Sequence, residues 1–188
     1  MRRLMMTVLT FTTVWAESGY RVSEALSNGY YRAETSLLLI GTDEIVGVNP
    51  ALTGYVEGDF FGGELLLDAK QFDTDNGMRD GHVRDILDTE TYPTIRFLIA
   101  SIRGIDEGEQ GEATCEGILS VRAQSRRVTF PVRWKRDGTR LILEGKSRVS
   151  YRDFGIAPPD VGWGVIKQAG DAIEVGARVV LVPGEEQE

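Results

Sequence analysis

The chain has 188 residues and a formal net charge of −8. This length is typical of a single domain that buries enough surface to fold without disulfides or metals. Because the negative charge repels a phosphate backbone, the composition argues against nucleic acid and against strongly anionic membrane surfaces as partners. The single cysteine, Cys115, excludes an internal disulfide. Its place in an apolar, alternating stretch predicts a buried and unreactive thiol.

The first 16 residues have the layout of a secretory signal peptide. Arg2 and Arg3 precede an uncharged apolar run from Leu4 to Ala16, and the small Ala16 is followed by Glu17. Such a run is too short to span a bilayer, which needs about 20 apolar residues. We expect cleavage after residue 16 and a periplasmic or secreted protein. A buried first strand is the alternative, because the run is rich in Thr, Val and Phe.

From about Tyr31 onward, apolar and polar residues alternate with a period of two, which is typical of strands with one buried face. Turn signals such as Asp137-Gly138 separate the runs. The predicted strands cover residues 32–39, 51–59, 63–69, 95–99, 112–122, 127–135, 140–149 and 173–181. They predict an all-β fold, an eight-stranded antiparallel barrel. We expect the barrel domain to cover residues 17–183 and the acidic tail 184–188 to fray.

Several positions on the predicted inward faces carry small side chains. They are Gly54, Gly58, Cys115, Gly117, Gly145 and Ala177. Small inward residues leave volume unfilled, which favours a cavity for a ligand. Glycines within strands also mark bulges and bends. The pattern leaves both interpretations open.

Residues 72–93 interrupt the alternation. The segment is polar and rich in turn residues, with a short helical period at Val83, Ile86 and Leu87. It predicts a long loop that contains one short helix. Long loops inside compact domains are usually functional.

Catalytic and metal chemistry has little support in the residue pattern. An EF-hand loop beginning at Asp73 needs Gly at its sixth place and Glu at its twelfth, where this chain has Met78 and Arg84. The single histidine, His82, would have to serve any Ser-His or Cys-His device. We therefore predict no catalytic residue, no metal and no cofactor, and we expect that the protein is not an enzyme.

Three stretches in order resemble the YceI-like family, the lipocalin-like polyisoprenoid-binding proteins. They are the run from Phe72 through Arg79-Asp80 to Phe97, the pair 117–121 and 128–132, and the run from Tyr151 to Ile156. The likeness extends from about Ser36 to Val182. It departs from the family at residues 33–36, where Ala-Glu-Thr-Ser replaces an Asp-x-x-His-Ser motif.

The resemblance implies a lipocalin-like barrel whose interior holds an isoprenoid, a quinone-like molecule or a fatty amphiphile. An apolar tunnel suits such a ligand, because each buried CH2 contributes about 0.8 kcal/mol. The lining candidates are Phe97, Leu119, Phe130, Trp134, Leu143 and Val175, the mouth candidates are Arg79, Asp80, Tyr151 and Arg152, and Phe72 and Phe154 complete the predicted site. Alternatively, the Arg79-Asp80 and Arg152-Asp153 pairs only pin the long loop to the barrel. In that case Phe72 and Phe154 are plug residues that close one barrel end, and the apolar inward residues are plain core.

Three functions remain open at this point. The first is a periplasmic or secreted carrier, and the second is a small enzyme on the same barrel that depends on His82. The third is an interaction module with a filled barrel, whose loop 72–93 docks a partner. A homodimer and transient membrane contact are both compatible with the sequence.

Overall fold

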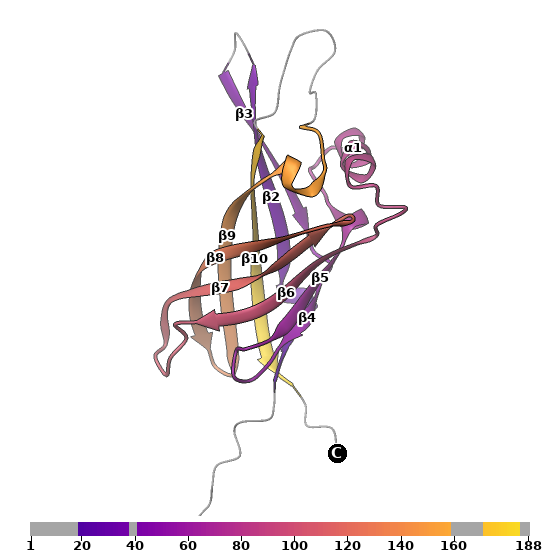
Figure 1. Ribbon diagram of the computed structural model, residues 1–188. Helices are drawn as coiled ribbons and strands as arrows, with labels where there is room; N and C mark the ends of the chain where they lie inside the picture. The colour runs from indigo at the N-terminus through magenta and orange to yellow at the C-terminus, as the bar shows by residue number, and fades with distance from the viewer. Residues whose placement is uncertain (1–18, 38–40, 159–170, 185–188) are drawn as a thin grey trace, which may run out of the picture.

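The computed structural model describes residues 19–37, 41–158 and 171–184 (Figure 1). The predicted signal peptide and residues 185–188 of the predicted tail lie outside these ranges. The strands are β1 (Tyr20–Val22), β2 (Asn28–Leu37), β3 (Gly41–Asn49), β4 (Leu52–Val56), β5 (Gly63–Asp68), β6 (Thr94–Arg103), β7 (Gln110–Val121), β8 (Gln124–Asp137), β9 (Arg140–Ser150) and β10 (Ala172–Pro183). The helical segments are α1 (Gly77–Leu87) and the short 3-10 turns η1 (Glu24–Leu26), η2 (Ala69–Gln71) and η3 (Tyr151–Phe154).

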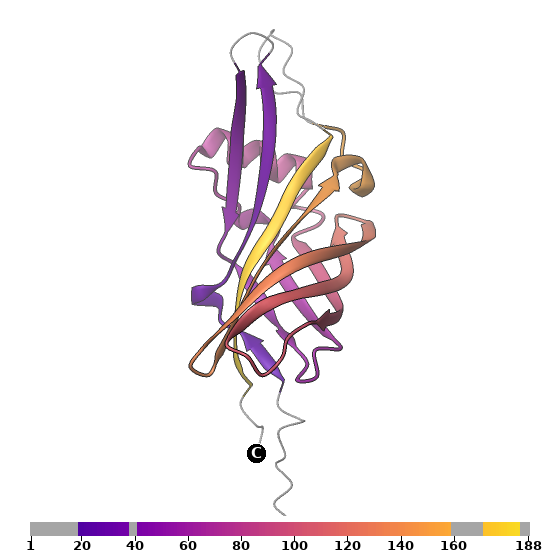
Figure 2. The ribbon, with the colours of Figure 1, turned by 90° about the vertical axis from the view of Figure 1, so that its left-hand side faces the viewer.

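Eight strand segments close into an antiparallel barrel (Figures 1 and 2). They follow the order β1-β4-β5-β6-β7-β8-β9-β10, and β10 pairs back onto β1. The hairpin of β2 and β3 extends the wall, because β2 pairs with β10 and β3 with β2. Closure satisfies strand edges that an open sheet would expose. The predicted all-β, eight-stranded antiparallel barrel is confirmed.

The first two wall strands are each broken into two segments, which the alternation did not predict. The turn η1 separates β1 from β2, so β1 pairs with β4 while β2 pairs with β3. Pro50, which has no backbone N–H, lies between β3 and β4. The predicted strand 51–59 ends at Val56, and β1 and β3 were missing from the prediction.

Asn49 holds the corner between β3 and β4. Its side chain is fully buried, its Nδ2 donates to the carbonyl oxygen of Asp68 at 2.8 Å, and its Oδ1 accepts from the N–H of Ala51 at 3.0 Å. In Asn49→Ala both backbone groups lose a partner, so we expect the free energy of unfolding to fall by about 2–4 kcal/mol. Urea denaturation measures this change, with Asn28→Ala at a half-buried position as the control. Equal midpoints for the two variants would contradict the assigned role.

The predicted loop at residues 72–93 contains α1, the one α-helix among the described residues. Asn76 caps its start, since the Asn76 Oδ1 accepts from the N–H groups of Met78 and Arg79, each at 3.1 Å. The helix ends at Leu87 and is capped by Asp88, which has a left-handed φ of 50°. In the described part of the chain, no helix combines the length and the apolar character that crossing a bilayer requires.

The two ends of the barrel differ. The closed end carries the start of β1 and the end of β10 (Figure 1), and it is filled by Trp134 and by the stacked rings of Tyr20 and Phe60, with centroids 5.5 Å apart. The mouth end carries α1, η3 and the turn between β7 and β8 (Figure 1). The apolar core lies between them.

Candidate functional site

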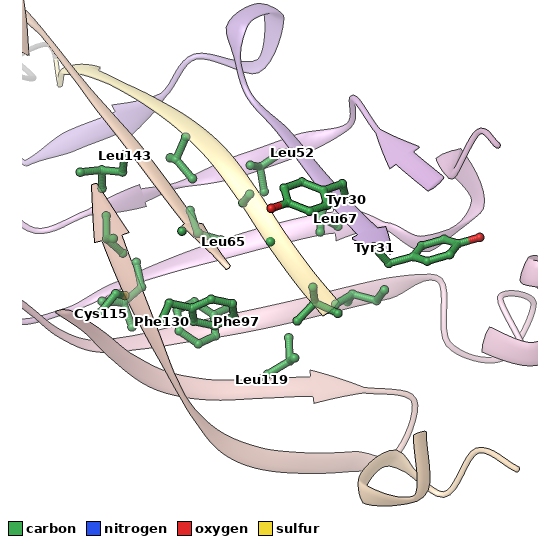
Figure 3. Close-up of a pocket in the computed structure, with 18 of the residues that line it drawn as sticks. Tyr30, Tyr31, Leu52, Leu65, Leu67, Phe97, Cys115, Leu119, Phe130 and Leu143 are labelled. Carbon is green, nitrogen blue, oxygen red and sulfur yellow. The ribbon is translucent and has the colours of Figure 1, made fainter. Parts of the chain in front are cut away.

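A cavity of about 160 Å³ lies inside the barrel (Figure 3). Its wall is almost wholly apolar and comes from β2, from the strands β4 to β10, and from Phe72. On β7 the lining runs from Cys115 through Leu119 to Val121, a stretch of six residue steps or about 20 Å of strand. The cavity is therefore long and narrow, with Tyr31 at its mouth end.

Half of the predicted site residues line this cavity. They are Phe72, Phe97, Leu119, Phe130, Leu143 and Val175. The rings of Phe97 and Phe130 meet edge to face with centroids 5.2 Å apart, and Figure 3 shows them between Cys115 and Leu119. This aromatic pair narrows the middle of the cavity. Contact of these residues with a ligand stays a prediction.

The small inward residues divide between the two interpretations that the sequence left open. Cys115, Gly145 and Ala177 line the cavity and add to its volume. Gly117 does not, because a Cβ at this position would lie only 2.5 Å from the ring of Phe97. Gly117 therefore seats the Phe97 ring against the sheet.

Two other glycines of the predicted inward set are needed for the path of the backbone. Gly54 has a φ of 139°, and a Cβ there would collide with the carbonyl oxygen of Glu64 on β5. Gly58 lies in the turn after β4, outside any strand. These two positions mark a close approach and a turn, and they contribute no ligand volume.

Trp134 and Phe154 are buried but do not line the cavity. The Nε1 of Trp134 donates to the carbonyl oxygen of Gly104 at 3.1 Å and fixes the ring at the closed end. Phe154 lies in η3 and packs against the core at the mouth end. Both belong to the apolar core around the cavity rather than to its wall.

A group of polar side chains gathers around Tyr31 at the mouth end. The Tyr31 ring packs edge-on against Phe72, with centroids 5.4 Å apart. Burial, and to a lesser degree the nearby Tyr151, raises the pKa of Tyr31 to about 12, while Arg79 and Asp80 also lie close enough to act on it. Three predicted mouth residues thus converge on a tyrosine that the sequence reasoning missed.

Both tyrosine hydroxyls at the mouth stay protonated at neutral pH. Burial raises the pKa of Tyr151 as well as that of Tyr31. A protonated phenol donates one hydrogen bond and accepts others. The mouth therefore offers two neutral donors to a polar head group, above a wall that is almost wholly apolar.

The mouth carboxylates and Arg152 also hold the surrounding loops in place. Asp80 Oδ1 accepts from the Thr74 N–H at 2.9 Å and from the Thr74 hydroxyl at 2.7 Å. Arg152 Nε donates to Asp171 Oδ1 at 3.1 Å. Asp80 thus ties the loop to itself, and Arg152 ties η3 to Asp171 beside β10 rather than pairing with the expected Asp153. That these pairs pin the long loop to the barrel stays a prediction. Asp153 instead accepts from the backbone N–H of Ser150 and caps η3.

The described residues do not bring together side chains for metal binding or nucleophilic catalysis at the cavity. Within residues 19–37, 41–158 and 171–184, no three metal-ligating side chains form a group. Asp73 Oδ1 instead accepts from the backbone N–H of Asp75 at 2.8 Å. His82 is exposed on α1, whereas Cys115 is buried on β7.

Cys115 is expected to react slowly. Burial, with a smaller effect of Glu116, raises its pKa from 9.0 to about 12. At pH 8 the folded protein should therefore hold about 1000-fold less thiolate than the unfolded chain. An aromatic disulfide reagent should label folded protein slower by at least this factor, as absorbance would show. Equal rates with and without denaturant would contradict it.

The same shift has a consequence for stability. The folded state favours the neutral thiol, so this contribution is complete below about pH 9, the ordinary value, and is lost as the pH rises toward 12. We expect the midpoint of urea denaturation to fall over this alkaline range, and Cys115→Ala to fall less steeply.

Comparisons with known proteins show which family and which solved structures this chain resembles. The profile of the YceI-like domain matches residues 34–181. A polyisoprenoid-binding domain from Saccharophagus degradans, implicated in plant cell wall breakdown, is similar with a TM-score of 0.71 and 13% identity over 89% of this chain and 99% of that one. BcnA from Burkholderia cenocepacia has a TM-score of 0.65 and 19% identity, over 85% of this chain and 98% of that one. A Campylobacter jejuni YceI protein has a TM-score of 0.53 and 16% identity, over 66% of this chain and 73% of that one.

These identities are low, so the three structures show a shared fold and no more. No sequence among curated proteins matches this chain. The family profile, in contrast, spans most of the barrel, from β2 to β10. The chain therefore belongs to the YceI-like domain family.

Proposed function

We propose that this protein is an exported carrier that holds a long-chain amphiphile inside its barrel. The proposal rests on the apolar cavity inside the barrel. Trp134 fills the barrel beyond one end of this cavity, and Tyr31 and Tyr151 border its other end. A chain lipid gains about 0.8 kcal/mol for each CH2 that leaves water. The polyisoprenoid-binding relative from Saccharophagus degradans supports an isoprenoid or quinone-like ligand over a simple fatty chain.

The volume of the cavity dictates how a long chain enters. A cavity of about 150 Å³ accepts one benzene-sized molecule, and this cavity measures about 160 Å³. A long chain therefore has to displace side chains. Phe97 and Phe130 are the pair to move, since they meet in the middle of the cavity and separate Cys115 from Leu119. Rotation of one ring would widen the narrow middle of the cavity.

Head-group recognition is assigned to the mouth. Tyr31 and Tyr151 can each donate a hydrogen bond without carrying charge. Arg79 and Asp80 both lie close enough to Tyr31 to act on its pKa, and their opposite effects partly cancel there. This arrangement suits a neutral carbonyl or hydroxyl head group better than a multiply charged one.

Export is part of the same proposal and depends on the leader-like segment of residues 1–16. A carrier of a water-insoluble chain is needed where that chain crosses an aqueous space. Fractionation of the host cells, followed by N-terminal sequencing, tests this component. We expect a periplasmic or secreted chain that begins at Glu17, whereas a cytoplasmic chain with Met1 intact would refute export and leave the binding proposal standing.

The binding proposal is tested on full-length protein produced in its own host. Native mass spectrometry should show a bound mass that organic extraction removes and that yields a long-chain lipid. The proposal assigns the barrel no catalytic role, so the extracted molecule should return unchanged after incubation with the protein. A barrel that carries nothing, and takes up no added isoprenoid, would refute the carrier function.

A second candidate follows from the small volume. Ligand pockets usually enclose about 300–1000 Å³, and this cavity is smaller. A barrel filled by its own side chains would present the loop of residues 72–93 to a partner protein. The two candidates differ in one result, because only the carrier binds lipid in the absence of any partner.

A further inference from the structure

Arg122 in the turn between β7 and β8, and Arg126 and Arg127 near the start of β8, lie at the mouth end of a chain with a net charge of −8. Arg122 is half-buried, and Arg126 and Arg127 are exposed. Among the described residues, none of the three forms an ion pair. Val121, which precedes them, lines the cavity. The turn lies at the same end of the pocket as Tyr31 (Figure 3).

The strand register distributes these arginines around the rim. Arg126 pairs with the cavity-lining Leu119 and so follows the inner parity of β8. Arg127 pairs with Ile118 on the outer face, and Ile118 pairs in turn with Leu98 on β6. Ile118 and Leu98 are each 39% exposed. Cations and exposed aliphatic side chains thus adjoin one another on this rim.

Arg122 occupies an unusual backbone position. It opens a two-residue turn closed by the pairing of Val121 with Gln124, and its φ is 54°. Glycine or asparagine adopts this left-handed conformation at lower cost than arginine. The chain therefore carries a positive charge at the tip of the turn despite an unfavourable backbone conformation.

Three acidic groups near the turn have other partners. Asp153 caps η3, and Asp171 pairs with Arg152. On the outer face, Arg96 adjoins Ser120 and holds Glu64. Three arginines without an ion pair among the described residues therefore lie together at this rim of a negatively charged chain.

We propose that Arg122, Arg126, Arg127, Leu98 and Ile118, here called the arginine rim, dock the mouth of the barrel on an anionic lipid surface. Salt screens charges beyond about 8 Å, so the rim meets lipid phosphates while distant carboxylates have little effect. The acidic composition, which argued against anionic membranes, describes the average field and not this rim. The arginines attract the anionic lipid head groups, and Leu98 and Ile118 insert shallowly into the bilayer. Docking of this kind would bring the cavity mouth to a bilayer.

Each arginine near an anionic surface is worth about 1 kcal/mol, or about fivefold in affinity. The test is flotation of the full chain, without added lipid cargo, on vesicles of phosphatidylcholine alone or mixed with phosphatidylglycerol. We expect binding only to the mixed vesicles at physiological salt. The triple variant Arg122→Asn, Arg126→Gln, Arg127→Gln should bind on the order of 100-fold more weakly. Asn preserves the left-handed turn.

The matched control removes the same charge at the closed end, through Arg133→Gln, Lys135→Gln and Arg140→Gln. We expect this control to bind within about threefold of the natural protein, since these positions lie beyond the screening distance from the rim. Equal losses in both variants, or no binding by the natural protein, would overturn the proposal. Retention of a protein partner by the rim in place of vesicles would overturn it too. Cargo measured by native mass spectrometry should persist in the rim variant, which separates docking from the proposed carrier function.

Discussion

Ala177→Phe is expected to lower isoprenoid uptake by at least tenfold while the barrel stays folded. Ala177 lines the cavity on β10, in register with Gly145 of β9. A phenyl ring there is about the size of the molecule that a 150 Å³ cavity accepts, so it should occupy most of the 160 Å³ present. Excluding only two CH2 groups of a ligand costs about 1.6 kcal/mol, which is more than tenfold in affinity.

Farnesol, a short isoprenoid alcohol, is a suitable probe, with uptake measured by native mass spectrometry. Thr129→Phe is the matched control, because it adds the same ring on the exposed outer face of β8. Circular dichroism should show the same strand content in both variants. If Ala177→Phe binds farnesol as well as the Thr129 variant does, the ligand does not occupy this cavity. Gly117→Phe is unsuitable for this purpose, since its Cβ would collide with the Leu98 carbonyl and the Phe97 ring.

Period-two alternation predicts the wall from β5 to β10 well, because those strands bury one face and expose the other along their length. It fails at β1, whose three residues are too short for a period to show. It also fails at β3, where Asp43, Glu44 and Gly47 obscure the alternation. Barrel closure depends on pairing β1 with β10, which are more than 150 residues apart, and no local pattern contains that contact.

The same reasoning explains which of the predicted residues line the cavity. Alternation fixes the face of a side chain, so Phe97, Leu119 and Leu143 were placed inward correctly. Alternation does not fix depth along the barrel axis, and Trp134 shares the inner parity of Phe130 but lies at the closed end. Tyr31 was missed although the alternation begins there with the parity of Ala33, because alternation does not show that this position reaches the cavity mouth. What marks Tyr31 as a lining residue is its pairing with the cavity-lining Val175. Only the pairing of β2 with β10 reveals this contact.

Trp134→Ala is expected to lower the free energy of unfolding by about 3–5 kcal/mol, the usual cost of deleting a large buried aromatic side chain. The Trp134 side chain is 3% exposed and donates to Gly104 at 3.1 Å. Its ring also lies close over Gly111, where a Cβ would be 2.9 Å from Nε1, and the Arg136 guanidinium lies 5.7 Å from the ring centroid. Loss of the ring would open the closed end to water. Urea denaturation measures the change.

Trp134→Phe separates end closure from ligand contact. The smaller ring keeps apolar packing and loses the hydrogen bond to Gly104, so we expect a loss of about 1–2 kcal/mol. Farnesol uptake should remain within about twofold of the natural protein, because Trp134 lies outside the cavity wall. Phe130→Leu is the matched comparison inside the cavity wall. For this variant, we expect the free energy of farnesol binding to change more than the free energy of unfolding. A Trp134→Phe variant with near-natural stability but sharply reduced uptake would show that the ligand reaches the closed end, and that the cavity lengthens when it is occupied.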